Sequence, residues 1–527
     1  MQPGDGPETC ADVEDLRRDA GFAPDTPIAH GVRRFVDWFR AYHENQSQAV
    51  AVHASRRICG HDRMTRAEAP PRRGWALRNL AWFLFLLMLA AFTAGRLVGP
   101  RIPDDQQKRW CAVNVHITAL FGVSLNCDSP EFMRVAAHPS ALLETTTPMQ
   151  SRPGMPIAAW LIARPLLPIA SLVPRLVARP ERADIDPGRI AGALQSFGPG
   201  YVAYVALNLL ILCCSFHLFR RTCRAHQPID QPGTVAVVAV SCATLMVATY
   251  PVTNFLLSPH SQLFNTLGPM LALSFAIRAE AGALADTRFA ATVGAIVGFG
   301  QTAYAIFFVI TMTVLLFAGV HAVRDWRGSA KLVLLRNAGI LVAMSVAPTI
   351  AWYSFLHFWI GQFHYHEIQD DKSVAWMVIA LQQGMAQFAA ELTRRVGFQL
   401  HGVISLLPTI ALMALVISGF LIATAVVLGR DKIVPLIREV RRTLGIALIV
   451  AVMFFGFYVC VGQFQVRLDY AALPPVVTAL GVIATTLAGH LPTMWRRLFG
   501  GACAAVALLA FVLAVAEGPH VMGQWFD

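Results

Sequence analysis

Long apolar runs alternate with short polar segments from about Trp75 to near the end of the chain. Several runs hold about 18 or more apolar residues, long enough for a helix to cross a hydrocarbon core ~30 Å thick. The pattern predicts an all-α polytopic membrane protein. The runs fall at about 76–96, 201–219, 233–251, 262–277, 289–321, 335–360, 400–428, 443–462, 470–489 and 498–516.

Basic residues in the short polar segments predict the orientation of these runs, because cytoplasmic loops are enriched in Arg and Lys. Arg72, Arg73 and Arg78 precede the first run, so its N-terminal end should be cytoplasmic. Basic residues flank run 289–321 on both sides, which predicts two crossings with a turn at Gly298–Thr302. The sum is about eleven transmembrane helices, with the N-terminus in the cytoplasm and the C-terminus outside the bacterial inner membrane.

The first 73 residues form a polar cytoplasmic segment, and 74–527 form the multi-span domain. The largest extracytoplasmic loop should be 97–200, and Cys111 and Cys127 within it would allow a disulfide in an oxidising compartment. Within this loop, Ile157–Val177 is apolar but broken by prolines, which favours a pair of short re-entrant or interfacial helices over a span. Val374–Val396 predicts a helix lying in the membrane interface.

Composition agrees with the membrane interpretation and excludes other classes. Charged residues make up 14% of the chain, against roughly 25% in soluble domains. The net charge of +11 comes from the basic loops, and no nucleic-acid motif accompanies it. The centres of the predicted spans are almost free of charged residues, which argues against an ion-coupled transporter.

The N-terminal segment carries the motifs MQPGD, ADVEDL, GFAPDTPI and GVRRFVDWF within residues 1–45. Thr26-Pro27 followed by Ile28, Val32 and Phe35 predicts a capped amphipathic helix. The segment resembles the C-terminal tail of UDP-glucuronate 4-epimerases. The family's NAD-binding glycine turn and Tyr-x-x-x-Lys pair do not precede it, so we expect no epimerase activity. A gene fusion, a rearrangement or an early start site explains such a remnant, and a small cytoplasmic adaptor helix is the alternative.

The loop after the first span holds the main candidate for catalysis. Asp128 and Glu131 are three residues apart at an expected helix start, which puts both carboxylates on one face. One of them could act as a general base towards a hydroxyl nucleophile. The structural alternative is a helix cap by Asp128, with Glu131 completing a capping box. Asp104 and Asp105 are a rival placement for the catalytic acid.

Two further polar clusters map to the same side of the membrane. Arg467 and Tyr470 lie at the expected mouth of a late span, where a guanidinium could bind a lipid phosphate or diphosphate. A side chain that merely extends to the headgroups is the alternative for Arg467. Asn254 and His260 lie in a polar segment between two spans, where a plain turn is the alternative.

The layout from Trp75 to Ala516 resembles the GT-C superfamily of polyprenyl-phosphate-sugar-dependent glycosyltransferases. DSPEFMRVAAHP resembles the acidic element of that family's first outer loop, SRPGMP the Pro-rich end of that loop, and RLDYAALPP its late Arg-x-x-Tyr-x-x-x-Pro element. The resemblance implies a lipid-linked sugar as donor and a glycan or lipid as acceptor, at most an accessory divalent metal, and no nucleotide site. It implies that Asp128 acts on the acceptor hydroxyl, and that Arg467 and Arg152 stabilise the leaving phosphate. A precursor flippase or transporter is the alternative, and a polysaccharide polymerase or ligase is a third reading.

Overall fold

The computed structural model describes residues 33–34, 36–37, 75–98, 112–116, 122–126, 128–145, 147–170, 187–226, 233–324, 331–363, 374–462 and 466–516. The chain divides into two compact units, Met1–Arg73 and Gly74–Asp527. In the first unit the described residues are Arg33, Arg34, Val36 and Asp37, which are helical and exposed. They fall inside the stretch for which the sequence predicts an amphipathic helix.

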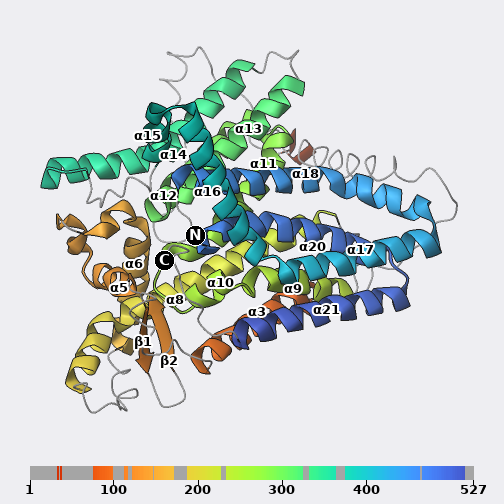
Figure 1. Cartoon of the computed structure of the whole chain (residues 1–527), viewed down its shortest axis with the longest axis horizontal. Helices are drawn as coiled ribbons and strands as arrows, with labels where there is room; N and C mark the ends of the chain where they lie inside the picture. The colour runs from red at the N-terminus through yellow and green to blue at the C-terminus, as the bar shows by residue number, and fades with distance from the viewer. Residues whose placement is uncertain are drawn as a thin grey trace. The chain divides into compact units, whose positions relative to one another are not determined.

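The second unit is mainly helical (Figure 1). Its first half contains α3 (Trp75–Val98), β1 (Ala112–His116), β2 (Gly122–Asn126), α5 (Ser129–Ala137), α6 (Gly154–Ala170), α8 (Pro187–Arg224), α9 (Gly233–Val247), α10 (Tyr250–Phe255) and α11 (Phe264–Glu280). Its second half contains α12 (Thr287–Ala303), α13 (Phe308–Arg324), α14 (Lys331–Ile360), α15 (Ala375–Gln383), α16 (Met385–Ser405), α17 (Pro408–Leu428), α18 (Arg430–Val461), α19 (Val466–Asp469), α20 (Leu473–His490) and α21 (Thr493–Ala516).

Eight helices of the described part are long and apolar enough to cross a membrane. The prediction of a helical, polytopic membrane protein is therefore confirmed, while the number of about eleven spans stays a prediction. The eight candidate spans are Asn79–Val98, Gly198–Arg224, Ala305–Arg324, Lys331–Ile360, Pro408–Val427, Ile433–Val461, Arg467–His490 and Thr493–Ala516.

The apolar run 289–321 is divided between α12 and α13, but the break is not where the sequence predicts it. Helix α12 continues through Gly298–Thr302 to Ala303, and the chain leaves the helix at the extended residue Tyr304. Glycine lacks a β-carbon, and at Gly300 this allows a close contact with a neighbouring ring rather than a turn. A β-carbon on Gly300 would collide with the ring of Phe307.

The segment before α8 differs from the expectation in its local structure. A two-stranded antiparallel hairpin joins β1 to β2, with Ala112 opposite Asn126 and His116 opposite Gly122. The apolar stretch predicted as two short helices is one helix, α6, as far as Ala170, and 171–177 lie outside the described residues. Cys111 and Cys127, the candidate disulfide, also lie outside them.

The helix predicted over Val374–Val396 is interrupted. Gly384 has φ +118°, a conformation that favours glycine, and it separates α15 from α16. Helix α16 then extends to Ser405. The expected single interfacial helix is therefore two helices with a break at Gly384.

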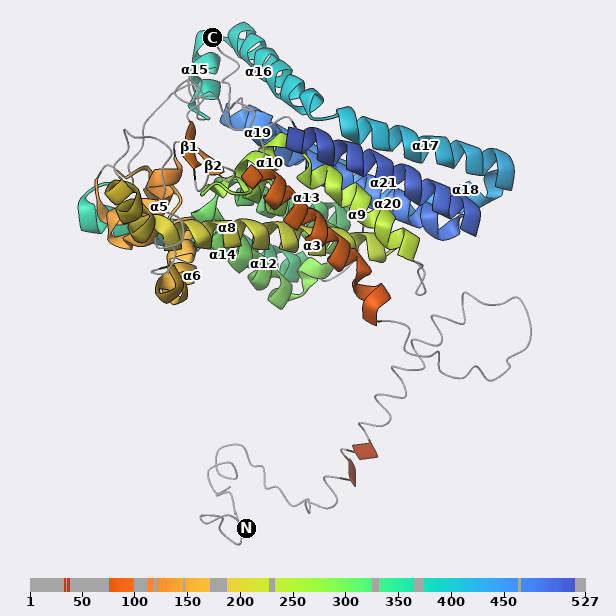
Figure 2. The same cartoon turned by 90° about the horizontal axis from the view of Figure 1, so that it is seen from below.

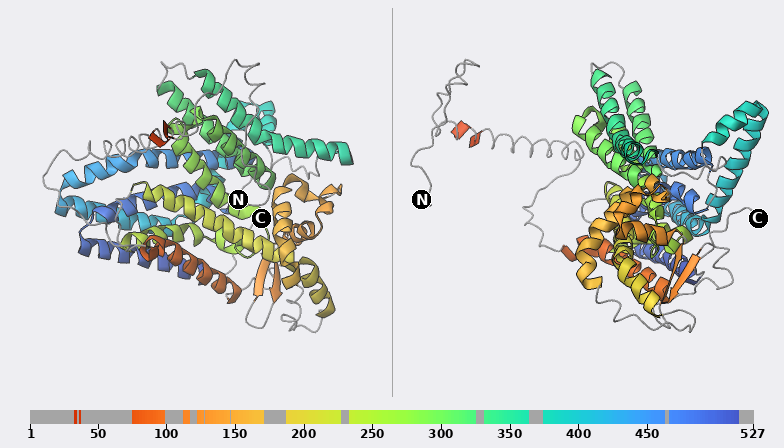
Figure 3. Two further views of the ribbon diagram at one scale, coloured as in Figure 1. Left: turned by 180° about the vertical axis from the view of Figure 1, so that it is seen from behind. Right: turned by 90° about the vertical axis from the view of Figure 1, so that its left-hand side faces the viewer.

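Close packing between helices follows the small-residue rule of membrane proteins. Gly294 and Gly298 have GxxxG spacing on α12, and a β-carbon on either would overlap Met344 of α14. Helices α12, α13 and α14, green in the figures, group along one edge of the bundle (Figures 1 and 3). Helices α3, α8, α9 and α21 lie side by side and share a buried apolar core (Figure 2).

Candidate functional site

Three polar segments that are distant in sequence meet near the N-terminal end of α11. The buried hydroxyls of Ser129 and Ser258 are 2.9 Å apart, which links the start of α5 to the segment after α10. The side-chain amide of Gln262 donates to the backbone carbonyl of Arg467, and that of Asn265 does so at 3.4 Å. The structure therefore brings the three candidate segments of the sequence into contact.

Asp128 and His260 face each other across this junction. Nε2 of His260 lies 3.5 Å from Oδ2 of Asp128, and the aspartate side chain is 50% exposed, whereas the histidine side chain is 3% exposed. The backbone N–H of Gln262 donates to Nδ1 of His260 at 3.0 Å. Because Nδ1 accepts a hydrogen bond, the ring proton is on Nε2 and is directed at the carboxylate.

The electrostatic surroundings fix the charge of both groups. Burial is the main reason that the pKa of His260 falls to about 4, and the positive charges of Arg467 and Arg152 lower it further, although Asp128 opposes this. The hydrogen bond from His260 is the main reason that the pKa of Asp128 lies below its usual value, against the opposing effect of burial. At neutral pH the pair is therefore a neutral imidazole that donates to an ionised carboxylate.

Arg152 and Arg467 place two guanidinium groups beside this pair. Nη1 of Arg152 donates to Oγ of Ser261 at 3.3 Å, and its Cζ lies 5.7 Å from the ring centroid of Tyr304. Cζ of Arg467 lies 5.6 Å from the ring centroid of Phe255. Both positive charges contribute to the lowered pKa of Asp128. Such a pair could bind a phosphate or diphosphate through forked hydrogen bonds.

A buried polar network supports this arrangement from the helix side. The hydroxyl of Tyr458 donates to Oδ1 of Asn265 at 2.7 Å, and the amide of Asn265 lies 3.5 Å from the hydroxyl of Tyr304. Since Tyr304 also lies under Arg152, the network connects that arginine to α11 and α18. Tyr304 and Tyr458 fall in apolar runs, and nothing in their sequence context points to a site.

Glu131, the second carboxylate predicted for catalysis, does not join Asp128. Its two oxygens accept from Nε and Nη2 of Arg134, each at 2.8 Å. Arg134 also binds Glu144 through Nη1. Glu131 therefore belongs to an ion-pair network within the loop, although both carboxylates lie near the start of α5 as expected.

The helix-cap alternative for Asp128 finds no support in the structure. Asp128 occupies the N-cap position of α5, yet its side chain makes no capping hydrogen bond. A capping box would also need Glu131 to reach back to this position, but Glu131 binds Arg134 instead. The carboxylate of Asp128 is left to face His260.

The remaining candidates lie elsewhere. Tyr470 is 1% exposed, and its hydroxyl donates to the carbonyl of Met246 at 2.7 Å, so it is part of the core. Asn254 accepts a hydrogen bond from Arg96 at 3.2 Å. Asp104 and Asp105 lie outside the described residues.

No cofactor or metal position emerges from the described side chains. In the described part of the chain, no group of three His, Cys, Asp or Glu residues is arranged to hold a metal ion. The cluster offers one carboxylate, one neutral imidazole and two guanidiniums. This set can orient a hydroxyl group and bind an anion.

Comparisons with known proteins cover only a short stretch of the chain. A stretch of 44 residues is 54% identical to Protein CapI of Staphylococcus aureus, and covers 8% of this chain and 13% of that protein. A stretch of 44 residues is 43% identical to an uncharacterized 37.6 kDa protein in the cld 5' region of Escherichia coli O111:H-, with the same coverage. No protein family and no solved structure matches the chain.

Proposed function

We propose that this chain is a GT-C-type membrane glycosyltransferase that transfers a sugar from a polyprenyl-phosphate donor to an extracytoplasmic glycan or lipid acceptor. The observation that carries the proposal is the half-exposed Asp128 carboxylate, held by neutral His260 beside Arg152 and Arg467. A glycosyl transfer from a lipid phosphate needs these two parts, a group that accepts the acceptor's proton and cations for the leaving phosphate. The resemblance of the N-terminal segment to a sugar-nucleotide epimerase tail supports a role in polysaccharide synthesis.

In the proposed reaction, Asp128 hydrogen-bonds the acceptor hydroxyl and receives its proton as the new bond to the anomeric carbon forms. The bond between that carbon and the phosphate oxygen breaks, and polyprenyl phosphate leaves with the bonding electrons. Arg152 and Arg467 stabilise the negative charge that develops on the leaving group. His260 keeps the carboxylate in position by donating from Nε2.

The chemistry distinguishes this proposal from the transporter alternative. A flippase binds a lipid-linked glycan and releases it unchanged, so it needs no proton acceptor at the sugar. Removing the Asp128 carboxylate should therefore stop transfer by a glycosyltransferase but not transport by a flippase. The two arginines do not distinguish the activities, because either protein would use them to bind phosphate.

Asp128→Asn tests the proposal directly. The change keeps the size of the side chain and removes the proton acceptor, and the loss of a general base lowers rates by roughly 10²–10⁴-fold. The assay is release of polyprenyl phosphate from a panel of polyprenyl-phosphate sugars in membranes with matched protein levels. Glu144→Gln is the control, because Glu144 is an exposed carboxylate of the same loop that pairs with Arg134.

Two results would contradict this assignment. Full transfer by Asp128→Asn, with loss in Asp104→Asn or Asp105→Asn, would move the proton acceptor to the earlier pair. Full transfer by all three variants would remove the basis for a carboxylate-assisted glycosyltransferase.

A further inference from the structure

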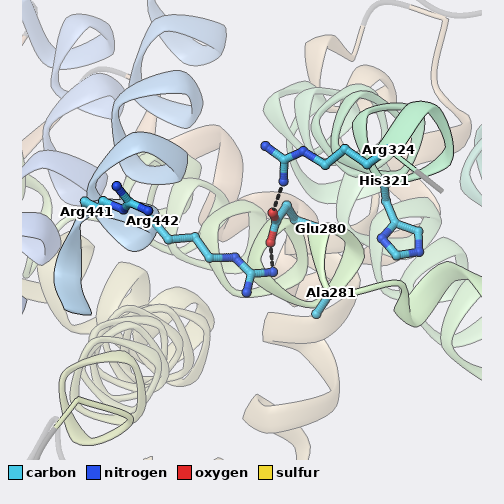
Figure 4. Close-up of a pocket in the computed structure, with 6 residues that line it drawn as sticks. All are labelled: Glu280, Ala281, His321, Arg324, Arg441 and Arg442. Carbon is cyan, nitrogen blue, oxygen red and sulfur yellow. Dashed lines mark hydrogen bonds and ion pairs between the residues drawn. The ribbon is translucent and has the colours of Figure 1, made fainter. Parts of the chain in front are cut away.

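An open cavity of about 760 Å³ lies between α11, α13 and α18. Its volume is in the range of small-molecule sites, roughly 300–1,000 Å³. Figure 4 shows its lining, which is Glu280, Ala281, His321, Arg324, Arg441 and Arg442. None of these residues belongs to the site proposed for glycosyl transfer.

The candidate span Ala305–Arg324 separates this cavity from the candidate site. Tyr304, directly before this span, lies under Arg152 at the candidate site, and Arg324, the last residue of the span, lines the cavity. A helix of 20 residues is about 30 Å long, which matches the ~30 Å of a hydrocarbon core. In the proposed orientation the cavity therefore opens at the cytoplasmic face.

The charges in the cavity do not balance. Nη1 of Arg324 donates to Oε1 of Glu280 at 2.6 Å, and Arg442 pairs with Oε2 of the same carboxylate. Figure 4 shows the two guanidiniums reaching Glu280 from different sides. No carboxylate in the described part of the chain pairs with Arg441, so the cavity is lined by three guanidiniums and one carboxylate.

A structural clamp explains only part of this arrangement. Glu280 is 8% exposed, and its two ion pairs tie the end of α11 to α13 and α18. The clamp accounts for Arg324 and Arg442, but it gives no role to Arg441 or to the open volume beside it. An excess of positive charge around an open cavity attracts anions, and arginine is well suited to phosphate oxygens.

We propose that this cavity binds a phosphate group, presented by an anionic lipid headgroup or by a soluble phosphate compound. Arg441 supplies a positive charge for the phosphate, because it takes no part in the two ion pairs of Glu280. Glu280 holds Arg324 and Arg442 in fixed positions, so these donors are arranged before the phosphate arrives. The site is separate from the proposed transfer site and does not depend on the function assigned there.

The test is binding to the purified full-length protein, measured by native mass spectrometry and by thermal unfolding. The probes are phosphatidylglycerol, inorganic pyrophosphate, and diacylglycerol as a lipid without phosphate. Arg441→Gln should weaken phosphate binding about tenfold, the usual effect of losing one hydrogen bond to a charged group. The variant keeps both ion pairs of Glu280, so it should fold normally. Arg497→Gln is the control, because Arg497 is exposed on α21 and changes the net charge equally.

Each result has a defined meaning. Binding of phosphatidylglycerol without competition by pyrophosphate supports a lipid headgroup as the ligand, and binding of pyrophosphate supports a soluble phosphate compound. The proposal is wrong if diacylglycerol binds as well as phosphatidylglycerol, if neither phosphate probe binds, or if Arg441→Gln and Arg497→Gln behave alike. Loss of binding in Arg467→Gln but not in Arg441→Gln would also overturn it, because the phosphate would then occupy the candidate site.

Discussion

His260 should make the stability of the protein depend on pH in a defined window. Its pKa is about 4 in the folded protein, against about 6.5 in an unfolded chain. Between these values the unfolded chain binds a proton that the folded protein does not, so stability falls as pH decreases from 6.5 towards 4. Each pH unit corresponds to about 1.36 kcal/mol, and the whole window to roughly 3 kcal/mol.

The groups that face His260 set the sign of this effect. Its ring lies between Phe132 and Phe255, with centroids 5.3 and 4.8 Å away, and these rings exclude water from the imidazole. Arg152 and Arg467 oppose a positive charge on the ring, and Asp128 favours one. The lowered pKa of Asp128 also makes the folded protein less stable as pH falls, because the carboxyl takes up a proton more readily in the unfolded chain. Most of this second loss comes at lower pH than the loss from His260, since the usual pKa of the carboxyl is 3.8.

The measurement is thermal unfolding in detergent between pH 4 and pH 7, for the wild type and His260→Gln. Glutamine does not titrate, so the variant should lose most of the decrease in melting temperature across this window. His138→Gln is the matched control, since His138 is an exposed histidine in the same loop as Asp128. Equal pH dependence in the wild type and His260→Gln, or an equal change in His138→Gln, would show that burial of His260 is not the cause.

Two further predictions test the anion site and the packing. Arg467→Lys keeps the charge but loses the planar fork, so it should weaken binding of polyprenyl phosphate about tenfold in a vesicle assay, with polyprenol as the control lipid. Wild-type affinity in Arg467→Lys would favour a mere headgroup anchor. Gly298→Leu should lower stability by ~1–3 kcal/mol, because the new side chain would overlap Met344. Gly319→Leu on α13 is its control, since a β-carbon there meets no neighbour among the described residues, and an equal effect of both changes would argue against close packing at Gly298.

The membrane class could be predicted from the sequence because it depends on composition over about twenty consecutive residues. Run 498–516 is apolar throughout and run 335–360 is mostly apolar, and α21 and α14 span them. Breaks within helices were harder to place. Gly298–Thr302 has the residues of a turn, but packing of Gly294 and Gly298 against α14 keeps α12 helical there. The helix ends at Tyr304, and neither neighbour of this residue in the sequence is a glycine or a proline that would predict the end.

The candidate site could likewise be predicted from the sequence only in part. The three polar segments were recognisable because polar residues stand out between apolar runs. Their contacts could not be predicted, because the pairing of Ser129 with Ser258 depends on how the helices pack. The spacing of Asp128 and Glu131 suggested a shared role, but Arg134, also three residues from Glu131, forms the closer pair. Local spacing cannot decide between two such partners.

The lowered pKa of Asp128 has a consequence for the order of events in the proposed reaction. A carboxylate with a pKa below its usual value is a weak proton acceptor, so the site without donor is poorly set for catalysis. A phosphate bound to Arg152 and Arg467 would offset the two positive charges that help to lower this pKa, and its own negative charge would raise the pKa further. Asp128 would then become a stronger base when the donor is present. In the proposed mechanism, donor binding therefore activates the group that acts on the acceptor, and the acceptor hydroxyl meets a strong base only when the donor is in place.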